Sequence, residues 1–149
     1  MKLKRNRLLV TALLVLATAG ASAEPLPEVV MHKDPNCGCC GQWAEHLQAN
    51  GFRVKTVPER DMESVKRRLA VPQRLTSCHT AKVGGYVIEG HVPASAIKRM
   101  LREKPAVAGL AVPGMPLGSP GMEVPGKQDP YDVVAFDKAG KAAVYESHR

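Results

Sequence analysis

The sequence has few aromatic residues, no internal repeat and only one long hydrophobic run, which lies at the N-terminus. Phe, Trp and Tyr make up 4% of the 149 residues, whereas hydrophobic residues make up 44% and charged residues 23%. This balance is typical of a globular chain of one domain and excludes disordered, collagen-like and fibrous proteins. Beyond the N-terminus, no apolar run approaches the roughly 20 residues of a membrane-spanning helix.

A concentrated basic region is also missing outside the first residues. Lys and Arg total 21 and Asp and Glu total 14, for a formal net charge of +7. Four of the basic residues lie before position 8: Lys2, Lys4, Arg5 and Arg7. Removing these four leaves 17 basic and 14 acidic residues, a net charge of +3. Because nucleic-acid binding requires a concentrated basic face, the charge distribution argues against a nucleic-acid partner.

The N-terminus has the three parts of a secretory signal peptide. A basic segment ends at Arg7, the apolar segment 8–19 follows, and Ala21-Ser22-Ala23 forms an A-x-A cleavage site. We predict cleavage after Ala23, which removes residues 1–23 and leaves 24–149 as a domain exported to the periplasm or secreted. After cleavage no membrane contact is expected. The alternative is an uncleaved N-terminal anchor, for which the apolar segment is short.

Apolar patterning in the remaining chain predicts an α/β domain. Strands are expected at 29–31, 52–57, 80–83 and 86–89, and helices at 42–50, 61–70 and from Pro93 onward. The dipeptide Gly84-Gly85 predicts a two-residue hairpin between the last two strands. The order β-α-β-α-β-β-α is that of a thioredoxin-like fold, in which a C-x-x-C sits between the first strand and the first helix. Cys37 and Cys40 occupy that place.

The segment 105–130 differs from the rest of the chain. It contains six prolines, five glycines and two methionines. A structureless segment of this length in a compact domain is usually a functional lid or a linker. After it, the patterns at 131–136 and 142–145 predict a C-terminal β-hairpin around Asp137-Lys138-Ala139-Gly140.

The cysteines are clustered. Cys37, Cys39 and Cys40 fall within four residues at the predicted start of a helix, where the helix dipole and free N–H groups stabilise thiolates. Cys37 and Cys40 can face one another, either as a redox-active and then catalytic pair or as two metal ligands. A third thiol, Cys39, favours a metal site or a resolving role. Cys78 precedes the predicted strand 80–83, and the predicted topology places it beside the C-x-x-C, so that all four can converge.

Thiolate and thioether ligands select Cu(I), with zinc as the alternative where thiolates dominate. Met115 and Met122 lie in the Gly/Pro-rich segment, where they serve either as further copper ligands or as buried anchors of a lid. The alternative for the four cysteines is a pair of structural disulfides, which are common in exported domains. Three cysteines within four residues close almost no chain loop, however, and would stabilise a fold poorly.

Among the histidines, His79 is the main candidate because it adjoins Cys78. It would act as a metal ligand or as a base for a thiol, and the alternative is a histidine in a surface loop. His46 lies about 10 Å along the predicted helix from the cysteines, too far to share one metal ion with them. His32 and His91 flank strand ends and are minor candidates.

Two further groups are assigned structural positions. The basic run Lys66-Arg67-Arg68 is expected on the solvated face of the helix at 61–70. The methionines at positions 31, 62 and 100 fall in predicted strands or helices, and they are expected in the hydrophobic core.

From Lys33 to about Phe136 the chain resembles the CopG-like periplasmic copper-resistance proteins, formerly a domain of unknown function. The matching segments are KDPNCGCCGQWAEHL, LTSCHTAKVGGYVIEGHVP and GLAVPGMPLGSPGME. The resemblance implies a thioredoxin-like fold, copper binding through clustered cysteines, and a role in copper tolerance. By position, the implied metal set is Cys37, Cys39, Cys40 and Cys78, with His79, Met115 and Met122 in the same matching segments.

The sequence also departs from ordinary thioredoxins. No Trp precedes the C-G-C-C segment, and Ser77-Cys78-His79 occupies the position where a cis-proline is expected. These departures favour metal chemistry over simple disulfide exchange at the same location.

We therefore predict an exported protein that binds copper, chiefly as Cu(I), and contributes to copper tolerance. The prediction includes a coupling of copper binding to thiol redox chemistry. Its expected partners are copper ions and other periplasmic copper-handling proteins. Two alternatives remain open: a thiol–disulfide oxidoreductase acting on protein substrates, and a zinc-binding or structural disulfide module. Turnover of a disulfide substrate without metal would favour the enzyme.

Overall fold

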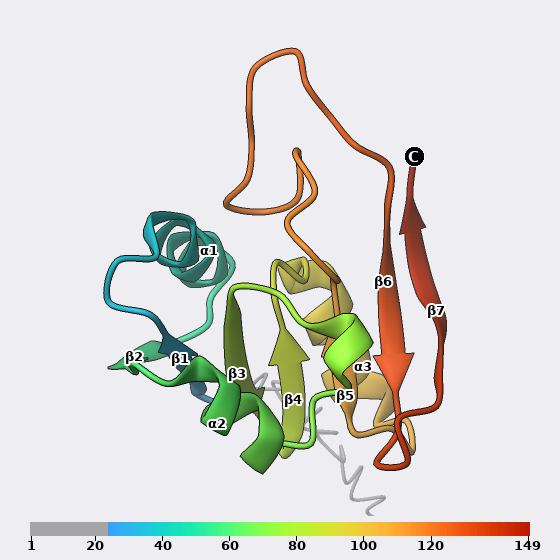
Figure 1. Cartoon of the computed structure of the whole chain (residues 1–149). Helices are drawn as coiled ribbons and strands as arrows, with labels where there is room; N and C mark the ends of the chain where they lie inside the picture. The colour runs from blue at the N-terminus through green and yellow to red at the C-terminus, as the bar shows by residue number, and fades with distance from the viewer. Residues whose placement is uncertain (1–23) are drawn as a thin grey trace, which may run out of the picture.

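The computed structural model describes residues 24–149, so the predicted signal peptide lies outside the described residues. The elements in chain order, drawn in Figure 1, are β1 (Val29–Lys33), α1 (Gly38–Ala49), β2 (Val54–Pro58), α2 (Met62–Arg68), the 3-10 turn η1 (Gln73–Leu75), β3 (His79–Val83), β4 (Tyr86–Glu89), α3 (Ala94–Glu103), β5 (Gly109–Ala111), β6 (Tyr131–Phe136) and β7 (Ala142–His148). No helix between residues 24 and 149 has the length and apolar character needed to cross a membrane.

The strands form one mixed sheet in the order β2-β1-β3-β4-β5-β6-β7. β1 and β2 are parallel, β3 is antiparallel to both β1 and β4, and the sheet continues through a parallel β4–β5 pair to the antiparallel β6–β7 hairpin. The predicted α/β class, the order β-α-β-α-β-β-α and the C-terminal hairpin are confirmed. The thioredoxin-like description of this order stays an interpretation of the topology.

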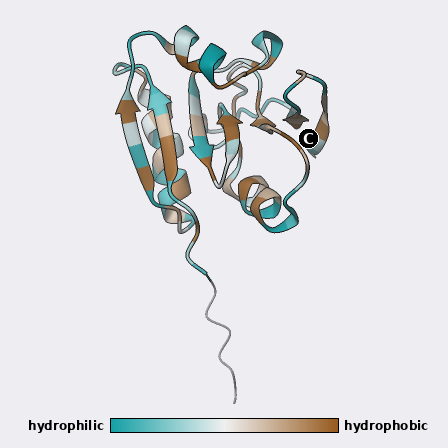
Figure 2. Ribbon diagram, turned by 90° about the horizontal axis from the view of Figure 1, so that it is seen from below, coloured by the Kyte–Doolittle hydropathy of each residue, from teal (hydrophilic) through white to brown (hydrophobic). Residues whose placement is uncertain are grey.

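Two hydrophobic cores cover the two faces of the sheet. The larger core packs α1 and α3 against one face, and its fully buried side chains include Met31, Trp43, Leu47, Ile88, Ile97 and Met100. Side chains alternate across a strand, so Val87 points to the opposite face and packs with Leu75, Ala111 and Phe136. The same alternation of hydrophobic and hydrophilic residues is visible along the strands in Figure 2. Of the three methionines expected in the core, Met31 and Met100 are buried and Met62 is half-buried.

Two element boundaries differ from the prediction. α1 begins at Gly38, four residues earlier than expected, so Cys39 and Cys40 are part of its first turn. The segment 105–130 is not structureless throughout, because Gly109–Ala111 forms β5 beside β4. A Cβ atom on Gly109 would lie 1.9 Å from the carbonyl oxygen of Val87, so only glycine allows this approach. Three residues are too few to show a strand periodicity, which explains why patterning missed β5.

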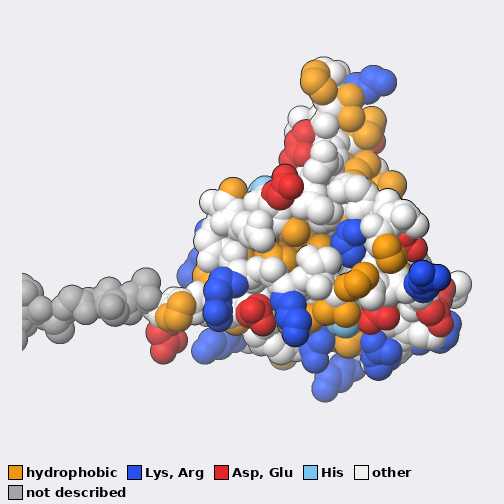
Figure 3. Space-filling view, turned by 90° about the vertical axis from the view of Figure 1, so that its left-hand side faces the viewer, with side chains coloured by type: hydrophobic (Ala, Val, Ile, Leu, Met, Phe, Trp, Pro, Cys, Tyr) orange, Lys and Arg blue, Asp and Glu red, His pale blue; other side chains and the backbone are white. Residues whose placement is uncertain are grey.

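The chain between β5 and β6 extends beyond the sheet before it returns. In Figure 1 it is the orange loop at the top, and in Figure 3 it stands out from the body of the molecule. Its large exposed hydrophobic residues are Met115 and Val124. This segment carries both methionines that the sequence analysis selected.

The prediction of a solvated basic run is wrong for Lys66. Its side chain is only 6% exposed, and its ammonium nitrogen lies 2.5 Å from a carboxylate oxygen of the fully buried Glu89. Arg67 and Arg68 are exposed as expected. The local pattern could not reveal this, because the buried partner of Lys66 lies 23 residues further along the chain.

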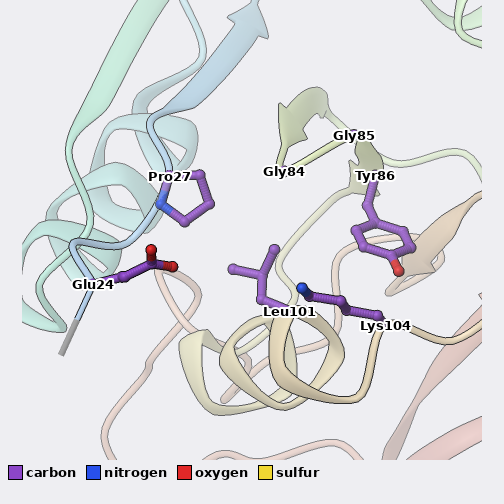
Figure 4. Close-up of a pocket in the computed structure, with 7 residues that line it drawn as sticks. All are labelled: Glu24, Pro27, Gly84, Gly85, Tyr86, Leu101 and Lys104. Carbon is purple, nitrogen blue, oxygen red and sulfur yellow. The ribbon is translucent and has the colours of Figure 1, made fainter. Parts of the chain in front are cut away.

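A cavity of about 400 Å³ lies at the far end of β3 and β4 from Cys78 (Figure 4). It is lined by Glu24, Pro27, Gly84, Gly85, Tyr86, Leu101 and Lys104. The Tyr86 hydroxyl donates a hydrogen bond to the carbonyl oxygen of Pro105. Since the lining contains neither cysteine nor histidine, this cavity is separate from the cysteine cluster.

Candidate metal centre

Three cysteines reach the site because a turn ends β1 and α1 starts immediately after it. The Asp34 side chain accepts a hydrogen bond from the Asn36 amide, and the Asp34 carbonyl accepts one from the Cys37 amide. Cys37 is then the N-cap of α1, and its side chain makes no capping bond. The sulfur atoms of Cys37, Cys39 and Cys40 therefore lie at a helix N-terminus, where the dipole favours negative charge.

The structure brings Cys78 to these three cysteines across 38 residues of sequence. All four sulfur atoms lie within 4.8 Å of one another. Cys37 and Cys40 form a disulfide with their Cα atoms 5.5 Å apart, whereas Cys39 and Cys78 are free. The Cys39 sulfur lies 3.6 Å from that of Cys37. The cluster thus combines one oxidised pair with two thiols in contact range.

Cys78 also belongs to a second group, with His79 and His91, whose ligand atoms lie within 4.8 Å of one another. The Cys78 sulfur is 3.2 Å from Nδ1 of His79 and 3.1 Å from Nε2 of His91. Nδ1 of His91 lies 2.7 Å from the carbonyl oxygen of Pro120, which can only accept a hydrogen bond. His91 therefore carries its proton on Nδ1, and its Nε2 lone pair faces the sulfur.

Burial holds both histidines in the neutral form that binds metals. Burial lowers the pKa of His79 well below its usual value, and the nearby His91 and Lys66 lower it further. Burial also lowers the pKa of His91. The His79 ring packs against that of Trp43, with ring centroids 4.4 Å apart and planes tilted by 46°, and its Nε2 is buried without a hydrogen-bond partner. His79 is consequently a buried residue of the site, not a histidine in a surface loop.

Cys78 differs from a reactive helix-terminal thiol. Burial, followed by repulsion from a charged Cys39, raises the pKa of Cys78 to about 12. Without a metal, Cys78 is therefore protonated at neutral pH. The thiol carries a single proton, so it can donate a hydrogen bond to only one of the two histidine nitrogens that face it. The other nitrogen receives no hydrogen bond from Cys78.

The segment after β5 covers the cysteines closely. A Cβ atom on Gly121 would lie 2.7 Å from the Trp43 amide nitrogen and 3.0 Å from the Cys39 carbonyl oxygen, so this segment packs directly on the first turns of α1. Met122 follows and is partly buried. Met115 is half-exposed and follows Gly114, whose amide donates to the carbonyl of Thr76. Both methionines thus lie in segments that border the cysteine cluster.

Two other histidines have structural partners outside the cluster. Nε2 of His46 accepts a hydrogen bond from the Ala94 amide at the start of α3. Nδ1 of His32 lies 3.1 Å from the Glu59 carboxylate. Sequence patterning makes His91 a minor candidate, whereas in the structure its Nε2 lies 3.1 Å from the Cys78 sulfur, and the sequence holds a signal for this placement. A two-residue loop at Gly84-Gly85 fixes the hairpin register, and extending this register beyond the Thr80–Glu89 pair places position 91 opposite Cys78.

Comparison with known proteins assigns the family. Residues 75–122 match the family described as "Protein of unknown function, DUF411". No curated protein matches the chain. Two solved structures of a copper resistance protein copG do: form 2 has 49% identity over 85% of this chain and 100% of that chain, with a TM-score of 0.80. Form 1 has 48% identity over 83% and 98%, with a TM-score of 0.78. The chain therefore belongs to the CopG-like copper-resistance family.

Proposed function

We propose that this protein binds copper, chiefly as Cu(I), and contributes to copper tolerance. The observation that carries the proposal is the convergence of four cysteine sulfurs within 4.8 Å at the N-terminus of α1. Thiolates are soft ligands that select Cu(I), or zinc as the alternative. The two matching structures, which are titled copper resistance proteins, favour copper over zinc.

The proposed ligand set is Cys37, Cys39, Cys40 and Cys78, with His79 and additional contributions from Met115 and Met122. We add His91 to this set, since its Nε2 lone pair faces the Cys78 sulfur. Cys78 belongs both to the four-sulfur group and to the group with the two histidines. A thiolate at this position is placed to bridge two metal ions.

Copper binding is coupled to thiol redox chemistry in this proposal. The Cys37–Cys40 disulfide withholds two of the four sulfurs from a metal. Its reduction by a dithiol takes up two electrons and two protons, and the dithiol becomes a disulfide in turn. Binding of Cu(I) then displaces the protons from the two thiols. The oxidation state of this pair would set how many sulfurs are available.

The disulfide also favours the second candidate function, a thiol–disulfide oxidoreductase with Cys37 and Cys40 as its catalytic pair. In either case residues 1–23 serve as a signal peptide, and the domain works in the periplasm beside other copper-handling proteins. Turnover of a disulfide substrate in the absence of metal would support the oxidoreductase function over copper binding.

Titration with Cu(I) tests the proposal. Reduced protein is titrated in competition with bicinchoninate, while metal analysis and free-thiol counting follow the same samples. Replacing both Cys37 and Cys40 by Ser should remove most Cu(I) binding and leave the circular dichroism spectrum intact, since the helix-terminal sulfurs are the ligands.

His32→Gln is the matched control, because His32 pairs with Glu59 outside the cluster and its replacement should leave copper binding unchanged. Unchanged copper stoichiometry in the double cysteine variant would overturn the proposal. A preference for Zn²⁺ over Cu(I) would support the zinc alternative, and unfolding of the variant would support structural disulfides.

A further inference from the structure

A buried ionic network lies directly behind the segment that carries Cys78. One Glu89 carboxylate oxygen accepts hydrogen bonds from the Lys66 ammonium at 2.5 Å and from the Ser77 amide at 2.6 Å. The other oxygen accepts one from the Thr80 hydroxyl at 2.6 Å. Lys66 also donates to the Thr80 hydroxyl oxygen at 3.1 Å. The four groups form a closed network, and Glu89 is fully buried.

The network holds the chain on both sides of the metal-site residues. Ser77 immediately precedes Cys78, and Thr80 immediately follows His79. We propose that Lys66 and Glu89 are positioning residues, which fix the Cys78 sulfur over the N-terminus of α1 and thereby set the copper affinity of the cluster. The inference rests on the proposed copper-binding function, because the affected quantity is the affinity for copper.

The fold alone gives little reason for such a pair. Burying two charges costs more than the Coulomb attraction returns in many proteins, and well-packed apolar side chains would often be neutral or more stable. The Ser77 amide, however, lies between η1 and β3, outside the sheet, and needs an acceptor. An ionised carboxylate forms hydrogen bonds roughly twice as strong as a neutral acceptor does. The charge therefore suits a role in fixing this backbone.

Tight packing transmits any displacement of Ser77 to the site. A Cβ atom on Gly90 would lie 2.5 Å from the Ser77 Cβ, so the two chain segments are already in contact. The Ser77 hydroxyl also donates a hydrogen bond to the carbonyl oxygen of Gly114. Ser77 is therefore restrained by Glu89, Gly90 and Gly114, and its bond to the buried Glu89 carboxylate is the charge-assisted one among these contacts.

The first test needs no metal. In the Cys37→Ser/Cys40→Ser protein only Cys39 and Cys78 remain, and oxidised glutathione converts them to one disulfide while releasing two reduced glutathione molecules. The equilibrium constant of this reaction gives the effective concentration of one thiol at the other, which measures how closely the fold holds Cys39 and Cys78 together. Lys66→Met/Glu89→Gln, which leaves no unpaired charge, should lower this constant about tenfold, because the Ser77 amide then donates to a neutral acceptor in place of a carboxylate. Arg99→Met/Glu103→Gln removes the partly exposed ion pairs of Arg99 with Glu103 and Glu146, neither of which involves the cysteine cluster, and should leave the constant unchanged.

The second test measures Cu(I) affinity, with bicinchoninate as competitor, in a double-mutant cycle. Lys66→Met/Glu89→Gln should weaken binding about tenfold in the protein with Cys78 and less than about twofold in the Cys78→Ser protein. A purely structural role would weaken binding equally in both. Equal losses, or no change in the glutathione equilibrium, would overturn the proposal.

If the double variant does not fold, Thr80→Val removes one donor to Glu89 at constant shape and enters the same two tests, with a smaller change in the same direction expected. No change in either test would overturn the proposal. Failure of the proposed function is distinguishable, because a protein that binds no copper at all still gives a glutathione equilibrium that decides whether the pair positions Cys78.

Discussion

Gly121 offers a sharp test of whether the segment after β5 covers the cysteine cluster. The residue has a φ of +85°, and an added Cβ atom would lie 2.7 Å from the Trp43 amide nitrogen and 3.0 Å from the Cys39 carbonyl oxygen. Both neighbours are backbone atoms of α1, which no side-chain rotation can move away. We therefore expect Gly121→Ala to displace residues 120–122 from α1 and to break the hydrogen bond between His91 and the Pro120 carbonyl oxygen.

Two effects contribute to the expected loss in the free energy of unfolding. A non-glycine residue in the left-handed region costs about 1–2 kcal/mol. Forcing extra volume into a packed contact costs about 1–3 kcal/mol more. For a domain of this size each kcal/mol lowers the Tm by about 4 °C. Gly121→Ala should therefore lower the Tm by about 8–20 °C, and Cu(I) should dissociate faster because the cover is displaced.

Gly126→Ala is the matched control. Gly126 lies in the same segment with a φ of +72°, but an added Cβ atom would meet nothing within 4 Å. It should show only the backbone cost, a Tm lower by about 4–8 °C, and unchanged copper dissociation. Calorimetry and stopped-flow transfer of Cu(I) to bicinchoninate measure the two quantities. If the two variants have equal Tm values and equal dissociation rates, the segment does not pack on α1 as described.

Three further outcomes are expected. Because the pKa of His79 is lowered on folding, the unfolded chain binds the extra proton first, so the free energy of unfolding should fall as the pH drops below about 6.5. His79→Gln should flatten that pH dependence in urea titrations, and an unaltered slope would contradict the assignment. The pKa of Cys78 near 12 predicts that iodoacetamide modifies this thiol slowly at pH 8 and much faster above pH 11, measured on the Cys78 peptide by mass spectrometry of the copper-free protein. Mass spectrometry of exported protein should find an N-terminus at Glu24, whereas an intact Met1 would refute the cleavage prediction.

The order of elements was predictable because local signals mark most of its boundaries. Gly84-Gly85 and Pro93 gave the β3–β4 hairpin and the start of α3, and both agree with the structure. The missed strand β5 depends on a contact that no local pattern encodes, namely the close approach of Gly109 to Val87. Elements defined by a single tertiary contact lie beyond what periodicity can show.

The site was predictable to a different extent for each residue. Three cysteines within four residues are visible directly, and Cys78 follows from topology, because the start of β3 lies beside the start of α1. His91 required one more step, the hairpin register that places it opposite Cys78. Lys66 could not be found, because a lysine in a basic run on a helix is normally solvated. Only the three-dimensional structure shows its buried partner Glu89.

In the proposed copper site, the raised pKa of Cys78 gives the neighbouring His91 a part in proton transfer. Its pKa of about 12 means that the thiol loses its proton at neutral pH only when a cation binds in its place. The Nε2 lone pair of His91, 3.1 Å from the sulfur, is the nearest group that can accept this proton. Because a protonated His91 would then repel the incoming cation, the proton must pass on to solvent or buffer for binding to be complete. Copper affinity should therefore rise with pH, and His91→Gln, which removes both this proton acceptor and a proposed ligand, should slow copper binding and weaken the equilibrium affinity.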